Sequence, residues 1–329
     1  MNLLSLFPRR TKGGSKTIKS VAVLLIALSA QVCSGAPLRI MPLGDSITQA
    51  LSDQRSYRYN LWVKLVDAGA TFDFVGSQDS NHGGNPVWPD HLGQPFDRHH
   101  EGHAGFRSDE IAASLPGWMS GYVPDVVLMH VGTNDVLQGK PNDETVVYLR
   151  RIIDLLRARN PHVAILLATL IPTTYLPQND HITELNARIE AIVLEKNASQ
   201  SPVILVDQSA GFDAAADLSD GVHPSASGEE KIARKWFEAL QLFLLKSNAG
   251  MTADGHLTLS FSRISSAVNL TYTVEVSGDL MEWNSGVGHT TELSVIDNGN
   301  GTESVLVRDE QSVDTSPRRF IRLRVDYSP

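Results

Sequence analysis

Ser46, Asp220 and His223 are the side chains of this sequence whose types and spacing suit nucleophilic catalysis. A serine hydroxyl is a weak nucleophile until a neighbouring base takes its proton, and the imidazole of His223 can be that base. Asp220 precedes His223 by three residues, so its carboxylate can hold the second ring nitrogen and fix the tautomer. These residues predict a Ser-His-Asp triad that works through an acyl-enzyme.

Acyl transfer also needs hydrogen-bond donors for the negative charge that develops on the carbonyl oxygen of the substrate. The backbone N–H groups of Ser46 and Gly105 and the side-chain amide of Asn134 are our candidates for this oxyanion hole. Losing one such donor typically lowers a rate by about 100- to 1000-fold. The mechanism requires no cofactor and no metal ion, and we expect neither.

Alternating strand and helix patterns over residues 38–245 would position these groups. We predict strands at 38–41, 72–75, 125–131, 163–170 and 203–206. Helices are predicted between and after them, at 57–68, 108–119, 144–159, 182–196 and 229–244. Strands separated by helices of this length indicate a five-stranded parallel sheet in a three-layer α/β/α sandwich, flavodoxin-like in type. Ligands of such sheets bind at the carboxyl ends of the strands, where the candidate residues fall.

Several local details follow from single residues. We expect Pro42 to end the first strand and Gly44 to allow a sharp turn into the helix that begins at Ser46. Ser108 is a candidate cap for the helix over 108–119. Val147 is among the apolar residues at helical spacing in the helix over 144–159, so we expect it to face the core.

Four short motifs follow one another at the predicted strand ends: GDS (residues 44–46), Gly105 within EGHAGF (101–106), GTND (132–135) and DGVHP (220–224). In this order they resemble the four blocks of the SGNH, or GDSL-type, hydrolases. The resemblance covers about residues 39–240 and implies a catalytic domain over 37–246. It implies the same roles: Ser46 as nucleophile, His223 as base, Asp220 as orienting acid, and Gly105 and Asn134 as oxyanion donors.

A narrower resemblance is carried by four segments: IMPLGDS (residues 40–46), SYR (56–58), FVGSQ (74–78) and HEGHAGF (100–106). They are similar to carbohydrate esterases of the acetylxylan-esterase type, which remove acetyl groups from plant-wall xylan. The resemblance implies an acetylated polysaccharide, or another small ester, as substrate. Residues 78–100, rich in Gly, Pro and His, depart from that pattern and would reshape the substrate cleft.

Two other functions remain open at this stage. A broad-specificity lipase or thioesterase would use the same catalytic groups with a deeper acyl pocket. A carbohydrate-binding protein without activity is a third hypothesis, from a different class, but the presence of Ser46, Asn134, Asp220 and His223 argues against it.

Other polar residues invite chemical roles that we consider weaker. His91, Asp97, His99 and His100 match no metal-ligand spacing, so we interpret this cluster as a solvated loop. Trp283 could be a platform for a sugar ring, but we favour a buried anchor of the C-terminal region.

Acids and histidines beside the catalytic motifs suit supporting roles. We expect Asp45 and Asp135 to accept hydrogen bonds from loop backbone. His103 and His130 are interpreted as supporting or core histidines whose ring nitrogens are satisfied.

The N-terminal segment has the pattern of a signal peptide. Five basic residues precede the apolar run VAVLLIALSA at 21–30, and SGA at 34–36 offers a cleavage site after Ala36. We therefore expect residues 1–36 to be removed and the protein to be secreted or periplasmic. Removal of five positive charges and no acids would change the formal charge from −9 to −14, and would also remove the single cysteine, Cys33. So acidic a chain has no electrostatic reason to bind nucleic acid or an anionic membrane.

The pattern of apolar and polar residues changes after residue 245. A polar, glycine-containing stretch at 246–255 reads as a linker, and short alternating runs follow it at 257–261, 272–276, 304–307 and 320–325. DNGNG at 297–301 is a strong turn signal. We predict a small all-β sandwich over 247–329, with a catalytic domain that works without it.

Overall fold

A computed structural model describes residues 36–329 apart from positions 246, 266, 268, 317 and 329. The predicted signal peptide, except Ala36, lies outside the described residues. The first region is built on a parallel sheet with the strand order β2-β1-β4-β5-β6, and the two-residue β3 (Glu101–Gly102) pairs with β1. The five main strands are β1 (Leu38–Gly44), β2 (Phe72–Phe74), β4 (Val126–His130), β5 (Ala164–Ala168) and β6 (Val203–Val206).

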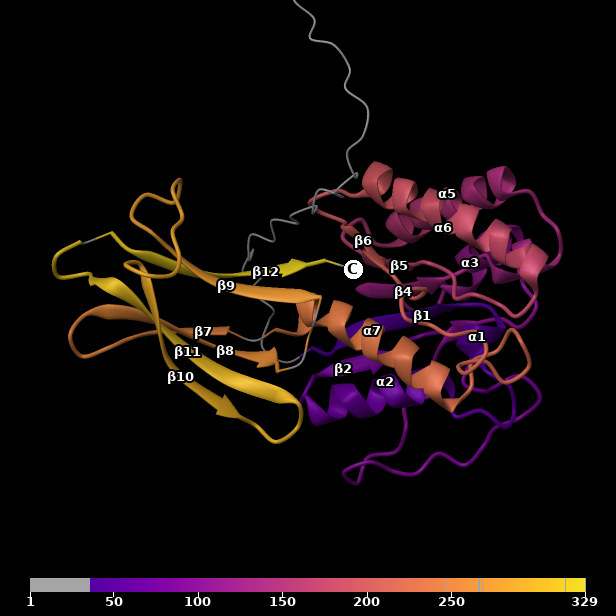
Figure 1. Cartoon of the computed structure of the whole chain (residues 1–329), viewed down its shortest axis with the longest axis horizontal. Coiled ribbons are helices and arrows are strands. Elements are labelled where there is room, and N and C mark those ends of the chain that lie inside the picture. Colours follow the sequence, from indigo (N-terminus) through magenta and orange to yellow (C-terminus); the bar gives the residue numbers. More distant parts are fainter. Residues whose placement is uncertain (1–35, 246, 266, 268, 317, 329) are drawn as a thin grey trace, which may run out of the picture.

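Helices cover both faces of this sheet, so the predicted five-stranded three-layer arrangement is confirmed (Figure 1). On one face lie α2 (Ser56–Asp67) and α7 (Ala226–Leu244). On the other lie α3 (Ser108–Trp118), α5 (Asn142–Arg159) and α6 (Leu176–Lys196). Two short helices follow strands closely in the sequence: α1 (Ser46–Gln49) comes after β1, and α4 (Thr133–Leu137) comes after β4.

The strands are apolar on both sides because both faces are covered. Side chains alternate across a strand, so Ile40 and Leu128 pack under α2 and α7, whereas Met41 and Val127 pack under the three helices of the opposite face. All four side chains are essentially inaccessible to solvent.

The first strand does not end at Pro42, contrary to our prediction, but continues to Gly44. The carbonyls of Ile40 and Gly44 accept hydrogen bonds from Val75 and His103, so the backbone groups of alternate residues face the β2–β3 edge. Pro42 falls on that edge after β2 has ended and before β3 begins. Its missing N–H therefore costs no bond in the ladder.

Two predictions about helices were also wrong. Ser108 is the first residue of α3 rather than its cap, and its hydroxyl donates to Asp135 Oδ1 over 2.5 Å. Arg107 is the N-cap residue, and its N–H donates to Glu110. Val147 is 59% exposed, because α5 turns Val146 towards the core instead.

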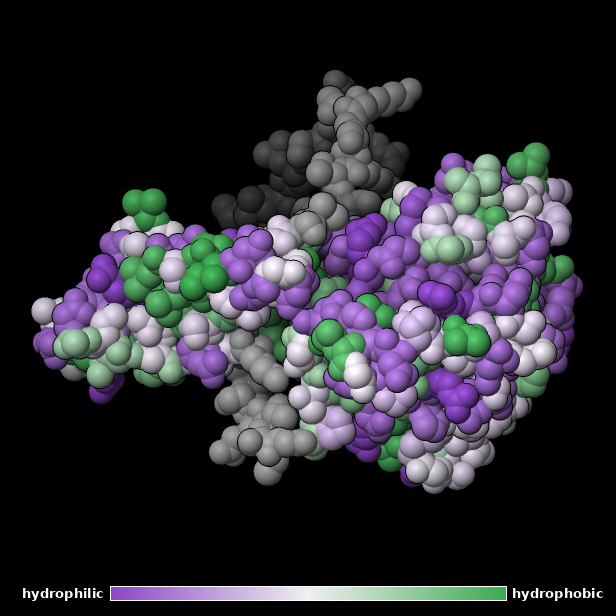
Figure 2. Space-filling view, turned by 90° about the horizontal axis from the view of Figure 1, so that it is seen from below, coloured by the Kyte–Doolittle hydropathy of each residue, from purple (hydrophilic) through white to green (hydrophobic). Residues whose placement is uncertain are grey.

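The C-terminal region consists of antiparallel strands in two sheets, as expected for an all-β fold. One sheet has the order β10-β11-β8-β7, and the other pairs β12 with β9. The strands are β7 (Ser247–Met251), β8 (His256–Ile264), β9 (Leu270–Ser277), β10 (Thr290–Asp297), β11 (Thr302–Ser312) and β12 (Phe320–Tyr327). In the space-filling view, hydrophobic residues gather on this region more than on the α/β region (Figure 2).

The predicted linker is partly wrong, since residues 247–251 form β7 and pair with β8. All five of its residues are exposed, so backbone pairing, and not burial, makes it a strand. The predicted turn at 297–301 is confirmed, and it connects β10 to β11.

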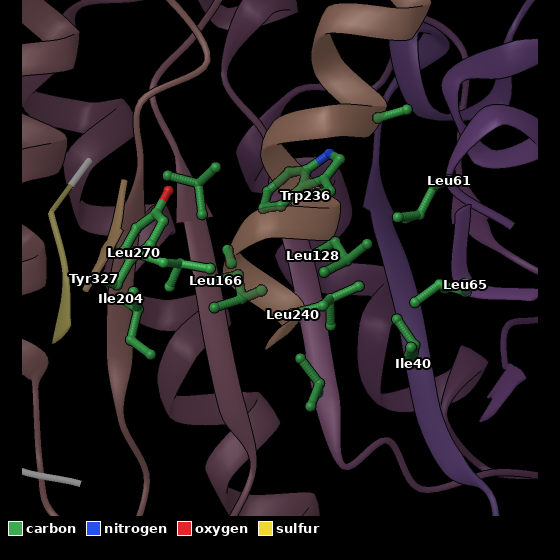
Figure 3. Packing of buried hydrophobic residues seen from close by; sticks show 14 of the residues in the cluster. Ile40, Leu61, Leu65, Leu128, Leu166, Ile204, Trp236, Leu240, Leu270 and Tyr327 are labelled. Carbon is green, nitrogen blue, oxygen red and sulfur yellow. The ribbon is translucent and has the colours of Figure 1, made fainter. Parts of the chain in front are cut away.

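Apolar side chains join the two regions in one cluster. Leu270 of β9 and Tyr327 of β12 lie beside Ile204 of β6, and Trp236 and Leu240 of α7 continue the row (Figure 3). All five are at least 90% buried.

Two polar contacts also join the α/β region to the C-terminal region, and we call this interface, with its apolar cluster, the seam. The Asn269 amide donates to Glu238 Oε2 over 3.1 Å, and the Asn300 amide donates to the Asp67 carbonyl over 2.7 Å. The described residues contain no helix that is long and apolar enough to cross a membrane.

Candidate active site

Ser46 begins α1 immediately after β1, as predicted. Asp45 caps this helix through a hydrogen bond from the Ile47 N–H to Oδ1 over 3.0 Å. The reason for Gly44 differs from our expectation, because a Cβ there would lie 2.3 Å from Thr48 Oγ1 and 2.6 Å from the His130 carbonyl oxygen. Glycine is needed for the close packing of α1 and β4 beside Ser46, not for an unusual turn.

The structure brings the three predicted triad residues into one chain of hydrogen bonds. His223 Nε2 lies 2.9 Å from Ser46 Oγ, and His223 Nδ1 lies 2.7 Å from Asp220 Oδ2. Ser46 and His223 come from opposite ends of the α/β region, 177 residues apart in the sequence. The Nδ1 contact leaves Nε2 free to accept the serine proton, which is the geometry that a general base needs.

The loop before α7 holds Asp220 and His223 in this position. Asp220 Oδ1 accepts the backbone N–H groups of Val222 and His223 over 3.0 and 2.8 Å. Partial burial alone would raise the pKa of Asp220, but hydrogen bonds from the backbone and ring of His223 outweigh it and lower that pKa. Asp220 therefore stays ionised, with its charge next to the His223 ring.

The candidate oxyanion donors lie on segments that contact each other. Asn134, at the start of α4, donates its amide to the Phe106 carbonyl over 3.1 Å, which places it next to the Gly105 block. Gly105 has φ of +81°, a conformation that favours glycine, and its carbonyl accepts from the Gln138 amide over 3.1 Å. This bond turns the peptide between Gly105 and Phe106, and the Gly105 N–H is not used by the described backbone.

Asp45 and Asp135 hold the loops as predicted, and both are fully buried. Asp135 accepts the N–H and hydroxyl of Ser108, which ties the Asn134 block to the start of α3. Burial raises the pKa of Asp45 to about 6, an effect that the Ile47 N–H and the charge of His223 only partly offset. Among the described residues, Asp45 Oδ2 has no hydrogen-bond partner.

His103 and Glu101 form a buried network beneath the Gly105 block. His103 Nε2 lies 2.5 Å from Glu101 Oε1, and the His103 ring stacks on Trp118 with the ring centroids 3.7 Å apart. Glu101 also accepts from Ser77 and from the Tyr122 hydroxyl. Burial alone would raise the pKa of Glu101, but the hydrogen bonds from His103, Ser77 and Tyr122 lower it.

Arg58 connects the loop over residues 78–100 to α1, the helix that begins at Ser46. Its fully buried guanidinium donates to the carbonyls of Thr48 and Gln49 in α1, to the Arg98 carbonyl and to Asn81 Oδ1. Burial lowers its pKa to about 10. The loop is thus packed against α2 near the site rather than free in solution.

The proposed solvated cluster at His91 is corrected in part. His91 pairs with Asp67 over 2.6 Å and His99 with Asp97 over 3.0 Å, so the four side chains do not converge. His100 is wholly buried and accepts the Gly102 N–H over 3.0 Å. Within the described part of the chain, no group of three or more His, Cys, Asp or Glu residues is placed to hold a metal ion.

Two further expectations were wrong. His130 is buried, but neither ring nitrogen has a hydrogen-bond partner among the described residues, and burial lowers its pKa to about 4. Trp283 is only partly buried, and the Arg322 guanidinium lies 3.8 Å from the centre of its ring.

Sequence reasoning missed the residues that connect the motifs. Gln49 accepts the Ala104 N–H over 2.8 Å, and Gln138, Glu101 and Arg58 make the contacts described above. Glu101 and Arg58 stand in segments that carried the narrower family resemblance, which was the available signal for them.

Comparisons with known proteins agree on the α/β region. Residues 43–231 match the model of the GDSL-like lipase/acylhydrolase family. A multidomain esterase of Ruminococcus flavefaciens is 31% identical over 261 residues, which are 71% of this chain and 33% of that protein. The chain thus spans about a third of the length of this curated relative.

Two solved structures are similar over nearly their whole length. A carbohydrate esterase family 3 protein from Talaromyces cellulolyticus is 31% identical, with a TM-score of 0.56 over 63% of this chain and 98% of its own. A family 3 carbohydrate esterase of Clostridium thermocellum is 33% identical, with a TM-score of 0.54 over 63% of this chain and 97% of its own.

Proposed function

The chain belongs to the GDSL-like lipase/acylhydrolase family of ester hydrolases, and on this premise we propose that it is a serine esterase that removes acetyl groups from carbohydrate. The observation that carries the proposal is the chain of contacts from Ser46 Oγ through the His223 ring to Asp220. A bare surface serine would not have a base on one side and an ionised acid behind that base.

In the proposed first half-reaction, Ser46 Oγ attacks the ester carbonyl carbon while its proton moves to His223 Nε2. The N–H groups of Ser46 and Gly105 and the Asn134 amide stabilise the oxyanion. The tetrahedral intermediate then collapses, the bond from carbon to the sugar oxygen breaks, and His223 gives its proton to that oxygen. Acetyl-Ser46 and the free sugar hydroxyl remain.

In the second half-reaction, water attacks the acetyl-enzyme while His223 takes a proton from it. The bond between the acyl carbon and Ser46 Oγ breaks, the proton returns to the serine oxygen, and acetate leaves. Asp220 stays ionised throughout and stabilises the protonated ring through Nδ1.

The carbohydrate in this proposal is supported by the two family 3 carbohydrate esterases, which are 31% and 33% identical to this chain. The acetyl group is supported by an acetyl esterase of known structure, also 31% identical, which was solved with an acetate ion. We further propose that residues 1–36 direct export and are removed, and that residues 37–246 form the catalytic unit. The mass of the exported protein tests the cleavage site.

The proposed activity is tested with esters of increasing acyl length. We expect kcat/KM for acetyl esters to exceed that for butyryl and octanoyl esters, and acetate to be released from acetylated xylan. A preference for octanoyl esters would instead support a lipase, and binding of acetylated glycan without turnover would support the non-catalytic alternative.

A further inference from the structure

A cleft of about 690 Å³, lined by both polar and apolar residues, adjoins the triad at Asp220. One wall is formed by residues 51–60, which follow the nucleophile helix, and the other by the catalytic loop and the start of α7. Its volume is within the range of ordinary ligand sites.

The proposed mechanism has the alcohol leave on the His223 side of Ser46, and residues of the loop that carries His223 line the cleft. His223 Nε2 has to protonate the departing sugar oxygen, so the sugar lies towards His223, whereas Gly105 and Asn134 hold the carbonyl oxygen on the other side. Ser219, Asp220 and Pro224, from the same loop as His223, line the cleft.

Gln54 lies in this cleft, and neither Ser46 nor His223 is among the residues that line it. The Gln54 amide donates to the Pro224 carbonyl over 2.9 Å, and its carbonyl accepts the Leu51 N–H over 3.0 Å, so it spans the two walls. A group bound in the cleft is therefore a neighbour of the esterified sugar along the chain, and not that sugar itself.

The cleft presents polar groups that the protein does not use. Among the described residues, the side chains of Asp53, Arg55 and Asn60 make no hydrogen bond or ion pair. Glu229 is only 6% exposed, and its Oε1 accepts the Ser56 N–H over 2.9 Å while no described residue occupies Oε2. Burial raises the pKa of Glu229 to about 7, so near neutral pH its carboxyl is present in both protonation states.

We propose that this cleft binds a neutral sugar of the polysaccharide, next to the sugar that carries the acetyl group. This inference rests on the proposed function. Sugar hydroxyls both donate and accept, which matches Asp53, Arg55 and Asn60 on one wall and the Glu229 carboxyl on the other. The cleft has three carboxyl groups, on Asp53, Asp220 and Glu229, and one guanidinium, on Arg55. This excess of acidic groups makes it unfavourable for an acidic sugar.

The test compares two substrates in the full chain. The double variant Arg55→Ala/Asn60→Ala is assayed on acetylated xylo-oligosaccharides and on p-nitrophenyl acetate, which has no neighbouring sugar to place in the cleft. We expect the ratio of kcat/KM values, oligosaccharide over p-nitrophenyl acetate, to fall about tenfold, the size expected for losing one or two hydrogen bonds. Arg151→Ala on α5 is the matched control, because Arg151 is also exposed but lies on the opposite face of the sheet. A ratio within twofold of the parent protein would overturn the inference.

A binding measurement separates this inference from the catalytic proposal. Calorimetry with Ser46→Ala protein and the acetylated oligosaccharide needs no turnover, and the two cleft substitutions should weaken its Kd about tenfold. Binding that depends on the cleft, in a protein with no activity on any ester, would refute the catalytic proposal and keep the inference. Hydrolysis of p-nitrophenyl acetate without oligosaccharide binding would refute the inference alone.

Discussion

Leu270 lies in the C-terminal region, yet its side chain packs against the α/β region. It is 8% exposed and shares a cluster with Ile204, Trp236 and Leu240 (Figure 3). Replacing a buried leucine by alanine costs about 2–5 kcal/mol, through lost burial and the cavity left behind. Because Leu270 is at the edge of the cluster, we expect Leu270→Ala to lower the free energy of unfolding by about 2–4 kcal/mol.

The assay follows two signals during urea unfolding. Esterase activity reports the α/β region, and far-ultraviolet circular dichroism reports the whole chain. If the seam couples the regions, Leu270→Ala lowers the midpoint of both signals, and the midpoint of thermal unfolding falls by about 2–4 °C for each kcal/mol. Leu280→Ala is the matched control, because Leu280 is 56% exposed in the same region and should cost less than about 0.5 kcal/mol.

An unchanged midpoint for loss of activity in Leu270→Ala would refute this reasoning. It would mean that the α/β region unfolds on its own, as the sequence led us to expect from the apparent linker. The shared cluster instead predicts that a chain ending at residue 245 would expose part of the core under α7 and lose stability.

The remaining predictions concern buried charges and metal independence. Burial raises the pKa of Asp45 from 3.8 to about 6, so its contribution to stability is present below pH 4 and is lost by pH 7. In urea unfolding, the free energy of unfolding of the parent should fall by about 3 kcal/mol over that range through Asp45, and Asp45→Asn should lack this fall. The same pH dependence in both proteins would contradict this. Arg58→Lys should cost about 2 kcal/mol or more, because an ammonium cannot serve all the carbonyls that the guanidinium reaches, and a melting temperature equal to the parent's would argue otherwise. Dialysis against a chelator should leave kcat unchanged; activity lost without unfolding would indicate a metal-dependent deacetylase and would withdraw the role given to His223.

The sheet, and the three residues that the structure joins by hydrogen bonds, could be predicted from the sequence because their signals are local. Runs of buried apolar residues marked β4, β5 and β6, and the motifs stood directly after strands or before α7. Parallel topology then brought Ser46 and His223 together without any long-range signal between them.

The missed features depend on contacts between distant residues. β7 has no apolar pattern, since its five residues are exposed and are held only by pairing with β8. Arg58 joins α1, α2 and the loop over 78–100, and Glu101 joins Ser77, His103 and Tyr122. The partners of Arg58 and of Glu101 stand at no regular spacing in the sequence, so these contacts could not be predicted from it.

The seam was missed for the same reason. Leu270 and Tyr327 lie just outside the runs predicted at 272–276 and 320–325, and nothing in β9 or β12 alone indicates that these two residues pack beside Ile204.

The central claim is that Ser46 is the nucleophile, and the residual kcat/KM of Ser46→Ala on an acetyl ester tests it most directly. Removal of one hydroxyl at this partly exposed position should leave the urea midpoint unchanged. We predict a fall in kcat/KM of at least about 10⁴-fold, because no other group in the triad can form the acyl-enzyme. A folded Ser46→Ala protein that keeps more than a few per cent of the parent activity would contradict the account.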